Sequence, residues 1–310
     1  MSAPEPACGE RRSGAHNDRR RLPRAAVMGT GAGMPGRSQL DRWADAARLA
    51  RAIALAGAVF GALLASAGIV RSQMMMDHLD MSSPEMTMAA MSREEVARRL
   101  AGGRGDFTAT RLNGLDLSGL DFTGVTFRSA RLNKANLADT VARGAIFDQA
   151  WMTGANLARA KLQGASFFQA QLIGAVLDDA DLSTARLPAN LTKASLKRAK
   201  LTGADLSADM RNQSMGLIGS VLRSANLEGA DLTGAKLSRA DLEFASLRNA
   251  NLSGADFSRA KLGGADLTGA RVDGADFTGA DLDSAKLIGL SGAESARLDS
   301  AVNLNKAVRQ

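Results

Sequence analysis

Residues 225–287 read ANLEG-ADLTG-AKLSR-ADLEF-ASLRN-ANLSG-ADFSR-AKLGG-ADLTG-ARVDG-ADFTG-ADLDS-AKL, and this stretch decides the fold. All thirteen first positions are Ala, and all thirteen third positions are Leu, Phe or Val. The second position is mostly Asp, Asn, Lys or Arg, the fourth is often Ser or Thr, and the fifth is often Gly. A period of five matches neither the 3.6-residue period of a helix nor the two-residue period of a plain strand.

The five-residue period indicates a chain that turns a corner after every unit, with Ala and the central Leu or Phe pointing inward. A unit this short cannot bury its own apolar face, so the units must stack as a solenoid. The motif runs from residue 106 to 287 and resembles the pentapeptide repeat family, whose repeat is A(D/N)LXX. The resemblance implies an all-β fold, a right-handed quadrilateral parallel β-helix with four units in each coil.

The spacing of the central Phe residues independently predicts the length of one coil. Two series show a step of four units: Phe107, Phe127, Phe147 and Phe167, and then Phe257 and Phe277. Bulky side chains stacked on one face of successive four-unit coils would produce this spacing, whereas coils of three or five units would scatter them.

We expect the β-helix to span residues 105–287 in about nine coils, because stacked units of this kind continue as long as the repeat does. Two irregularities lie near its middle. Pro188 shortens one unit by a residue, and residues 207–216 lose the pattern and add one. The phase returns at Leu217 and Leu222, so we expect the two irregularities to cancel and to form surface bulges.

The repeat fades after Leu287, and residues 288–310 are predicted to form a C-terminal cap. An uncovered last coil would expose the edges of its strands. Five apolar residues can cover it: Leu290, Leu298, Val302, Leu304 and Val308. In the resembling family this end often dimerises, which implies a homodimer through the C-terminal end.

The N-terminal third has a different character. Residues 1–41 are rich in Arg, Gly and Pro and are predicted to be a disordered tail. Residues 42–71 contain an uncharged apolar run, 52–70, which as a helix would span about 28 Å of a bilayer. Arg42, Arg48 and Arg51 precede the run, which predicts the N-terminus on the cytoplasmic side.

Two interpretations of this segment stay open. One is an uncleaved membrane anchor in a bacterial inner membrane, with the solenoid outside the cytoplasm. The other is a signal peptide cleaved near Ala67, within the sequence Ala65-Ser66-Ala67, which would give a periplasmic or secreted protein.

Residues 72–91 are a Met-rich linker that is a candidate copper site, because thioether sulfur is a soft ligand suited to Cu(I). The candidate ligands are Met74, Met75, Met76, His78, Met81, Met86 and Met88. The alternative is a flexible linker or a small apolar segment in which Met is an adaptable filler. Residues 92–104 begin with an S-x-x-E capping box at Ser92 and predict a short capping helix followed by a Gly-rich turn.

Composition excludes several function classes for the solenoid. No His or Cys follows residue 104, so a zinc site, a Ser-His-Asp triad or a Cys nucleophile cannot be assembled there, and no catalytic residue or cofactor is predicted. The chain carries 39 basic and 32 acidic residues, but residues 105–310 hold only 24 and 22 of them. A nearly neutral solenoid makes nucleic acid an unfavoured partner, because nucleic-acid-binding domains show a sustained basic face.

Outward positions of the solenoid should be polar, and four residues within about two coils break that rule. These residues are Ile146, Trp151, Phe168 and Ile173, and we refer to them as the apolar patch. Exposed apolar patches often mark contacts, so the apolar patch is the candidate interaction site. A basic stretch from Arg186 to Lys200 is most simply a solvated face.

Three hypotheses for function follow. The first is a non-enzymatic scaffold, exported or anchored through residues 52–70, that binds a protein partner. The second comes from the resemblance, since some family members mimic DNA and bind gyrase; the near-neutral solenoid and the export signal disfavour it. The third is a periplasmic copper-handling protein that uses the Met-rich linker.

Overall fold

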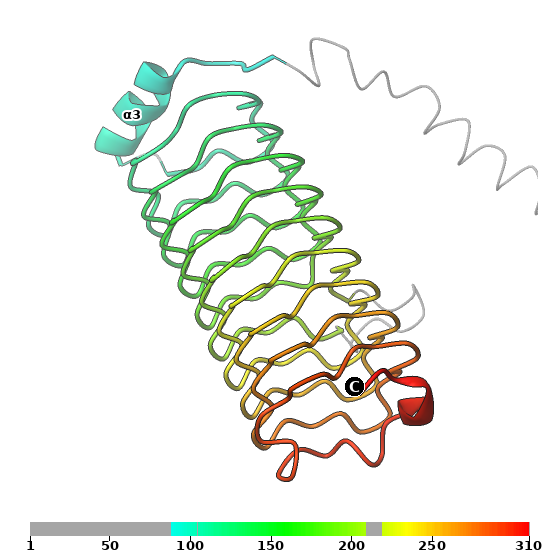
Figure 1. Ribbon diagram of the computed structural model, residues 1–310. Helices are drawn as coiled ribbons and strands as arrows, with labels where there is room; N and C mark the ends of the chain where they lie inside the picture. The colour runs from blue at the N-terminus through cyan, green and yellow to red at the C-terminus, as the bar shows by residue number, and fades with distance from the viewer. Residues whose placement is uncertain (1–87, 104, 209–218, 310) are drawn as a thin grey trace, which may run out of the picture. The chain divides into compact units, whose positions relative to one another are not determined.

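The computed structural model describes residues 88–103, 105–208 and 219–309, which belong to one compact unit, Leu79–Gln310. These residues form a stack of coils with the helix α3 (Arg93–Ala101) at its N-terminal end and the short 3-10 helix η2 (Leu304–Lys306) near its C-terminal end (Figure 1). The predicted tail, the apolar segment 42–71 and the linker up to residue 87 lie outside the described residues.

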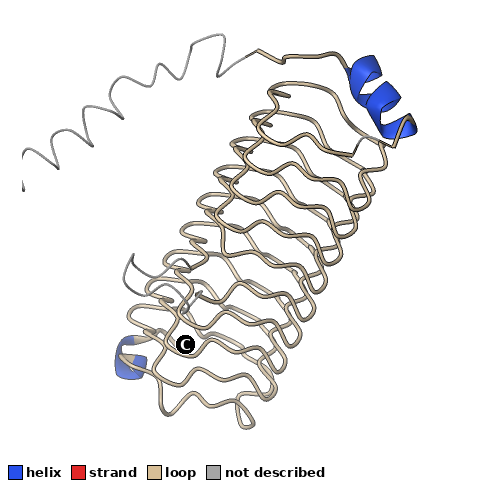
Figure 2. Cartoon of the chain, turned by 180° about the vertical axis from the view of Figure 1, so that it is seen from behind, coloured by secondary structure: helices blue, strands red, loops and turns tan. Residues whose placement is uncertain are grey.

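Parallel bridges between neighbouring coils hold the stack together, and over most of its length each bridge joins second-position residues four units apart, as Asp106 to Thr126. The coil length predicted from the Phe spacing is therefore confirmed. Each face contributes one bridge residue per coil, so the described residues contain isolated bridges and no longer strands, and Figure 2 draws the coils as loops.

Four columns of bridged residues define four faces, which we call A to D in chain order and number by coil from 1. Face A is the column Asp106, Thr126, Ile146, Ser166, Arg186, Asp205, Lys236, Asp256, Asp276 and Arg297. Face B is the column Arg111, Arg131, Trp151, Gln171, Asn190, Val221, Asp241, Lys261, Asp281 and Val302. Faces C and D start at Asp116 and Asp121 in the same way.

The corners explain why the fifth position favours Gly. The backbone there has a positive φ, for example 66° at Gly254, and the same conformation recurs at non-glycine residues such as Arg259 with 57°. A turn hydrogen bond closes each corner, as from the Ala260 N–H to the Phe257 carbonyl at 2.9 Å. Glycine adopts this left-handed conformation without the steric penalty that a Cβ brings.

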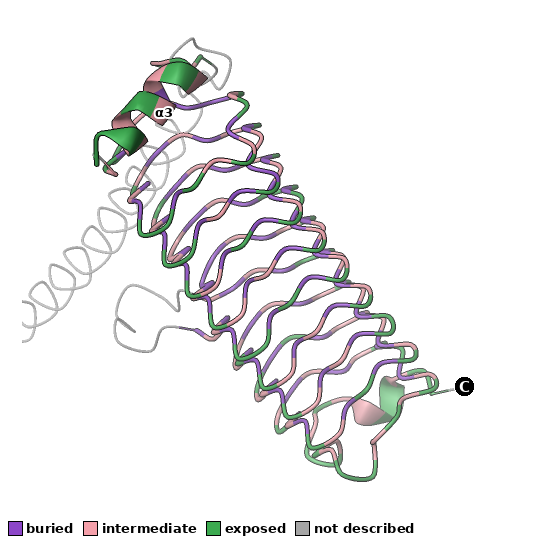
Figure 3. Ribbon diagram, turned by 90° about the vertical axis from the view of Figure 1, so that its left-hand side faces the viewer, coloured by how far each residue is buried: buried purple, intermediate pink, exposed green. Residues whose placement is uncertain are grey.

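The interior is filled by the first and third residues of every unit, as the burial colouring in Figure 3 shows. The aromatic rings stack along the rod, with centroids 5.4 Å apart for Phe107 and Phe127 and 5.0 Å apart for Phe127 and Phe147. The Phe257–Phe277 pair stacks at 5.1 Å. The regular pattern of small and large residues thus produces one continuous apolar core.

The predicted boundary at residue 287 is corrected by the structure. The columns continue to Ser291, Arg297, Val302 and Val308, so residues 288–310 add a further coil instead of only covering the last one. Backbone pairing does not require Ala or Leu side chains, so the coils continue beyond the last residue of the sequence repeat. Leu290, Leu298 and Leu304 do pack on the core, whereas Val302 and Val308 are bridge residues with exposed side chains.

The middle of the solenoid confirms one irregularity and corrects the other. The bridge between Gln171 and Asn190 falls one position short of the usual step, as the shortened unit at Pro188 predicts. The next bridge in that column joins Asn190 to Val221, so the chain makes a much longer excursion between these two positions. The described columns resume at Val221, and Leu217, where the phase is expected to return, lies outside the described residues.

The ends of this insertion meet at one corner of the coil. A Cβ placed on Gly219 would lie 3.2 Å from the Cβ of Ala208, so the two described residues that border positions 209–218 meet at the same corner. Coil 6 closes normally around them, because closure depends on where the chain returns and not on how many residues intervene.

The helix α3 takes the place of a preceding coil at the N-terminal end. Its N-cap is Ser92, whose Oγ accepts from the Glu95 N–H at 3.4 Å, as the capping box predicts. The Arg93 guanidinium donates to the carbonyls of Asp116 (2.7 Å) and Ser118 (2.8 Å), and Val96 is fully buried. In later coils the corresponding carbonyls accept backbone N–H groups from the coil before, so Arg93 supplies donors that the first coil lacks.

Among the residues that the structure describes, no helix is long and apolar enough to cross a membrane. The predicted apolar run 52–70 is not among those residues.

Candidate interaction surface

The apolar patch predicted from the sequence is divided between two faces. Ile146 and Phe168 lie on face A, and Trp151 and Ile173 lie on face B, in coils 3 and 4 of each face. The coils are in direct contact, because the Gln149 N–H donates to the Phe168 carbonyl and the Gly154 N–H to the Ile173 carbonyl. The structure thus forms two apolar pairs, one on each side of a corner.

The patch is less exposed than the sequence suggests. Ile173 has 36% of its surface exposed, and the other three side chains are half-buried. The Arg186 guanidinium lies 4.3 Å from the centroid of the Phe168 ring, within cation–π range, and covers part of that ring. Face A therefore presents a mixed aromatic and cationic surface at this level, and face B the more apolar one.

Sequence reasoning missed the most exposed aromatic residue of the described solenoid, Phe244. Its side chain is 68% exposed and stands at the fifth position of its unit, with φ 59°. A left-handed conformation costs a non-glycine residue about 1–2 kcal/mol. The repeat itself held the signal, because Phe244 stands at the fifth position, where Gly is frequent. Only Phe residues at the central position entered the prediction from the sequence.

The ring of Phe244 lies on the coil that follows it. A Cβ placed on Gly264 would come within 2.7 Å of the Phe244 ring, so the ring fits there only because residue 264 has no side chain. Phe244 is flanked by a charged group of three, in which Arg223 pairs with Asp241 (2.8 Å) and with Glu243. Val176, 37% exposed on face C, is a further apolar residue that the sequence reading missed.

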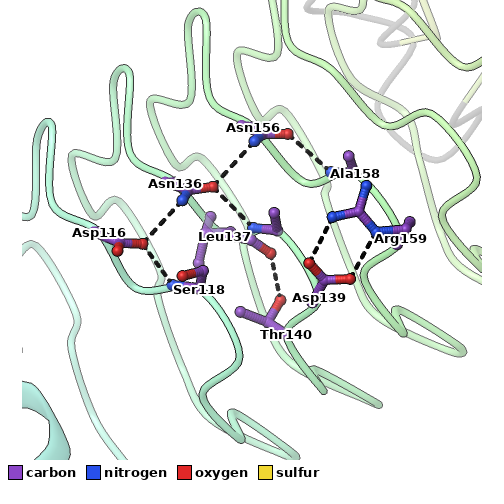
Figure 4. A network of polar contacts seen from close by, with 10 residues as sticks. Asp116, Ser118, Asn136, Leu137, Asp139, Thr140, Asn156, Ala158 and Arg159 are labelled. Carbon is purple, nitrogen blue, oxygen red and sulfur yellow. Dashed lines mark hydrogen bonds and ion pairs between the residues drawn. The ribbon is translucent and has the colours of Figure 1, made fainter.

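Polar side chains elsewhere pair along the rod at the spacing of one coil (Figure 4). The Asn136 amide donates to Asp116 at 2.9 Å and the Asn156 amide to Asn136 at 3.0 Å, which makes a ladder on face C. At the next corner, Arg159 pairs with Asp139 at 2.7 Å. The hydrogen bond from Arg159 holds the pKa of the Asp139 carboxyl below its usual value.

The basic stretch 186–200 continues this corner ladder. Arg198 pairs with Asp179 at 2.7 Å, and its hydrogen bond lowers the pKa of the Asp179 carboxyl. Arg186 covers Phe168, as described above. At least part of the stretch is therefore engaged in contacts within the chain.

The copper hypothesis falls almost entirely outside the described residues. Of its candidate ligands, only Met88 is described, and 63% of its surface is exposed. Within the described ranges, no group of three His, Cys, Asp or Glu residues is arranged to hold a metal ion.

Open cavities gather at the C-terminal end of the described solenoid. One of about 680 Å³ is lined by Leu304, Asn305, Ala307 and Arg309, and one of about 530 Å³ extends it towards Leu287 and Leu298. Their charged lining groups are Glu294, Asp299 and Arg309. Half-buried Leu and Ala side chains thus border an end that no helix covers in the way that α3 covers the other.

Comparison with solved structures finds other solenoids of this kind. HetL, a pentapeptide repeat protein involved in heterocyst differentiation regulation from the cyanobacterium Nostoc, is 32% identical over 70% of this chain and 94% of its own, with a TM-score of 0.30. QnrB1, a plasmid-mediated fluoroquinolone resistance protein, is 18% identical over 59% of this chain and 90% of its own, with a TM-score of 0.35. No curated protein sequence matches the chain.

The family model for pentapeptide repeats matches the sequence in eight copies. The matched residues are 106–187, 189–207 and 217–289, which together make up more than half of the chain. The four columns of parallel bridges and this match confirm the quadrilateral β-helix predicted for the repeat region. The chain belongs to the pentapeptide repeat family.

Proposed function

We propose that this protein is a non-enzymatic scaffold, exported or membrane-anchored, that binds a protein partner through the apolar side chains of faces A and B. The observation that carries the proposal is the concentration of four outward apolar residues, Ile146, Trp151, Phe168 and Ile173, in two adjacent coils. Elsewhere the same positions are mostly polar. Aromatic side chains that are partly exposed on a rigid surface are typical anchors of protein interfaces.

The absence of an enzyme-like site in the described solenoid supports the same proposal. Pentapeptide repeat proteins are generally structural or regulatory proteins. The core of the described coils is filled by Ala, Leu and Phe, and the sequence has no His or Cys after residue 104. Enzyme sites are concave pockets with convergent polar groups, and the apolar patch lines none of the three cavities found among the described residues.

The test compares the proteins captured by chemical cross-linking to the full chain and to a Trp151→Ser/Phe168→Ser variant in the native cell. We expect the variant to lose the partner that the unchanged chain captures. Val141→Ser is the matched control, because Val141 is an outward apolar residue on face D. Identical capture by all three proteins would contradict a role for the apolar patch.

The proposed location is tested by cell fractionation with N-terminal sequencing of the mature protein. An anchor leaves the apolar run in the membrane fraction, and a signal peptide gives a new N-terminus near Ala67. A cytoplasmic protein with an intact N-terminus would contradict export and would return attention to the gyrase hypothesis.

A further inference from the structure

Face B carries opposite charges at its two ends. The second, fourth and fifth positions of coils 1–5 contain four basic residues and no acidic residue: Arg111, Arg131, Lys134 and Lys193. The same positions of coils 6–9 contain four acidic residues, Asp241, Glu243, Asp281 and Asp283, against Arg223 and Lys261, and Lys306 of coil 10 pairs with Asp283 at 3.0 Å. A second copy of this face, turned end for end, would therefore meet the first with opposite charge.

The apolar residues of face B follow the same division. Trp151 and Ile173 lie in coils 3 and 4, and Val221 and Phe244 lie in coils 6 and 7. They are centred on coil 5, half a coil from the boundary between coils 5 and 6. A two-fold axis at that boundary, parallel to the strands, would set coil n of one chain opposite coil 11 − n of the other, and every contact would occur twice.

We propose that face B is the contact surface of an antiparallel, side-by-side homodimer. In this register Phe244 lies opposite Gly174, a position without a side chain beside the exposed Ile173. Trp151 lies opposite Lys261, which suits a cation–π contact. Arg131 lies opposite Asp281, and Lys134 lies opposite Ser284 beside Asp283, which pairs with Lys306 within its own chain.

The charges also select this register over its neighbour. A shift of one coil, to 10 − n, sets Arg131 opposite Lys261 and places Lys193 of one chain against Lys193 of the other. Like charges opposed across an interface are unfavourable. The 11 − n register avoids both clashes.

Phe244 provides the independent evidence for a partner at this face. Its corner conformation is one that glycine adopts more easily, and 68% of its surface stays exposed within the described chain. The corner closes equally well with Gly, as at Gly264 and Gly254. The contact with Gly264 within the chain leaves most of the ring exposed, whereas a partner's Gly174 and Ile173 would cover it.

The length of the face is sufficient for a stable interface. Ten coils at a spacing of about 4.8 Å give a strip about 48 Å long. A contact strip roughly 17 Å wide would then bury the about 800 Å² per partner that standard interfaces bury.

The first experiment measures self-association of the full chain by sedimentation equilibrium. We expect Phe244→Gly to weaken dimerisation about thirtyfold, the loss that removal of a hot-spot aromatic brings. Asn249→Gly is the matched control, because Asn249 has φ 54° in the same coil and overlies Gly269 at a corner away from face B. A chain that is monomeric throughout, or a dimer that Phe244→Gly leaves unchanged, would overturn the proposal.

The second experiment tests the register with cross-chain disulfides in a Cys8→Ser background, which removes the chain's own Cys. Lys193→Cys chains are mixed with Ser224→Cys chains, because the axis sets coil 5 of one chain opposite coil 6 of the other. We expect a cross-linked heterodimer from this mixture and none from Lys193→Cys with Ser284→Cys. A dimer that forms neither link, as one joined through the C-terminal end would, contradicts the proposal.

This inference rests on the proposed function in treating the outward faces as contact surfaces, but the two can fail separately. Loss of dimerisation in Phe244→Gly with unchanged capture of another protein by the apolar patch supports both. Capture that depends on Trp151 and Phe168 in a strictly monomeric chain supports the proposed function and overturns the homodimer.

Discussion

The units of this protein differ most at the corners of the coil, because the interior positions repeat almost without variation. Eighteen non-glycine residues of the described chain adopt a positive φ, and several of them place long side chains along the rod. Ser129, Gln149 and Gln169 form a hydrogen-bonded series at one corner, and Asp139, Arg159, Asp179 and Arg198 form a charged series at another. The side chains at these corners thus form contacts between coils that offset part of the cost of the positive φ.

The charged corner series predicts a pH-dependent contribution to stability. The pKa values of Asp139 and Asp179 are lowered by hydrogen bonds from Arg159 and Arg198, so their contribution is present above the unfolded-state pKa and is lost as the pH falls through the folded-state pKa. Arg159→Gln should therefore lower the melting temperature slightly at pH 7 and leave it unchanged at about pH 2, where the carboxyls are protonated.

Thermal unfolding followed by circular dichroism at the two pH values checks this prediction. Arg111→Gln is the control, because Arg111 makes no ion pair with a residue that the structure describes. An equal effect of Arg159→Gln at both pH values would show that the side chain acts by packing and not by charge.

At the scale of the element, the Arg93 side chain holds the helix α3 to the first coil. Its guanidinium takes the place of the backbone N–H donors that a preceding coil would supply. Arg93 donates to two carbonyls that a preceding coil would otherwise occupy, and Val96 is buried beside them. We expect Arg93→Ala to destabilise this end by about 1.5 kcal/mol, the low end of the range for hydrogen bonds to charged groups, because the side chain is partly exposed.

Hydrogen exchange resolved along the chain measures the effect. Amides of α3 and coil 1 should exchange faster in Arg93→Ala, while those of coils 5–9 should not change, since each coil contacts only its neighbours. Arg98→Ala is the control, because Arg98 pairs with Glu95 inside the helix. A uniform change along the whole rod would contradict a local capping role.

The elements also show what the sequence could and could not reveal. The Phe series and the shortened unit at Pro188 predicted the coil length and one register shift, because both follow from how bulky side chains and backbone must stack. The length of the excursion between Asn190 and Val221 was not predicted, because Leu222 stands a multiple of five residues after Leu187 and the extra residues therefore leave the phase unchanged. The last coil was missed because backbone bridges at Arg297 and Val302 need no repeat signal.

The candidate surface was predictable only in part. Apolar residues at outward positions identified Trp151 and Ile173, but the repeat pattern does not indicate that Arg186 covers Phe168, since that contact links side chains in adjacent coils. Phe244 was not predicted, because the fifth position was considered only as a corner and the side chain there was not examined. The charge division of face B appears only when residues far apart in the chain are assigned to one column.

At the scale of the whole molecule, the rod should tolerate the loss of one complete coil better than the loss of a shorter piece. Deletion of residues 256–275, a whole coil, joins Ala255 to Asp276 and keeps every later residue on its own face. Deletion of residues 256–270, three units, brings Arg271 from face D onto face A and moves all later columns by one face. We expect the whole-coil deletion to lower the melting temperature less than the three-unit deletion.

Thermal unfolding of the two deletion variants beside the unchanged chain checks this order. The reason is that the whole-coil deletion sets Asp276 next to Lys236 on face A, whereas the three-unit deletion sets Arg271 there and opposes like charges. If the three-unit deletion proved the milder change, the units would be equivalent on all four faces and the columns would carry no stability.

The meeting of Ala208 and Gly219 at one corner has a consequence for how such a rod can change over time. When the two residues that border an insertion meet in this way, the length of the insertion does not affect the backbone pairing of the neighbouring coils. Any compact module whose own termini lie close together can be grafted there while the backbone pairing of the rod continues. The solenoid can then carry different recognition elements at this corner, and its core residues need not change.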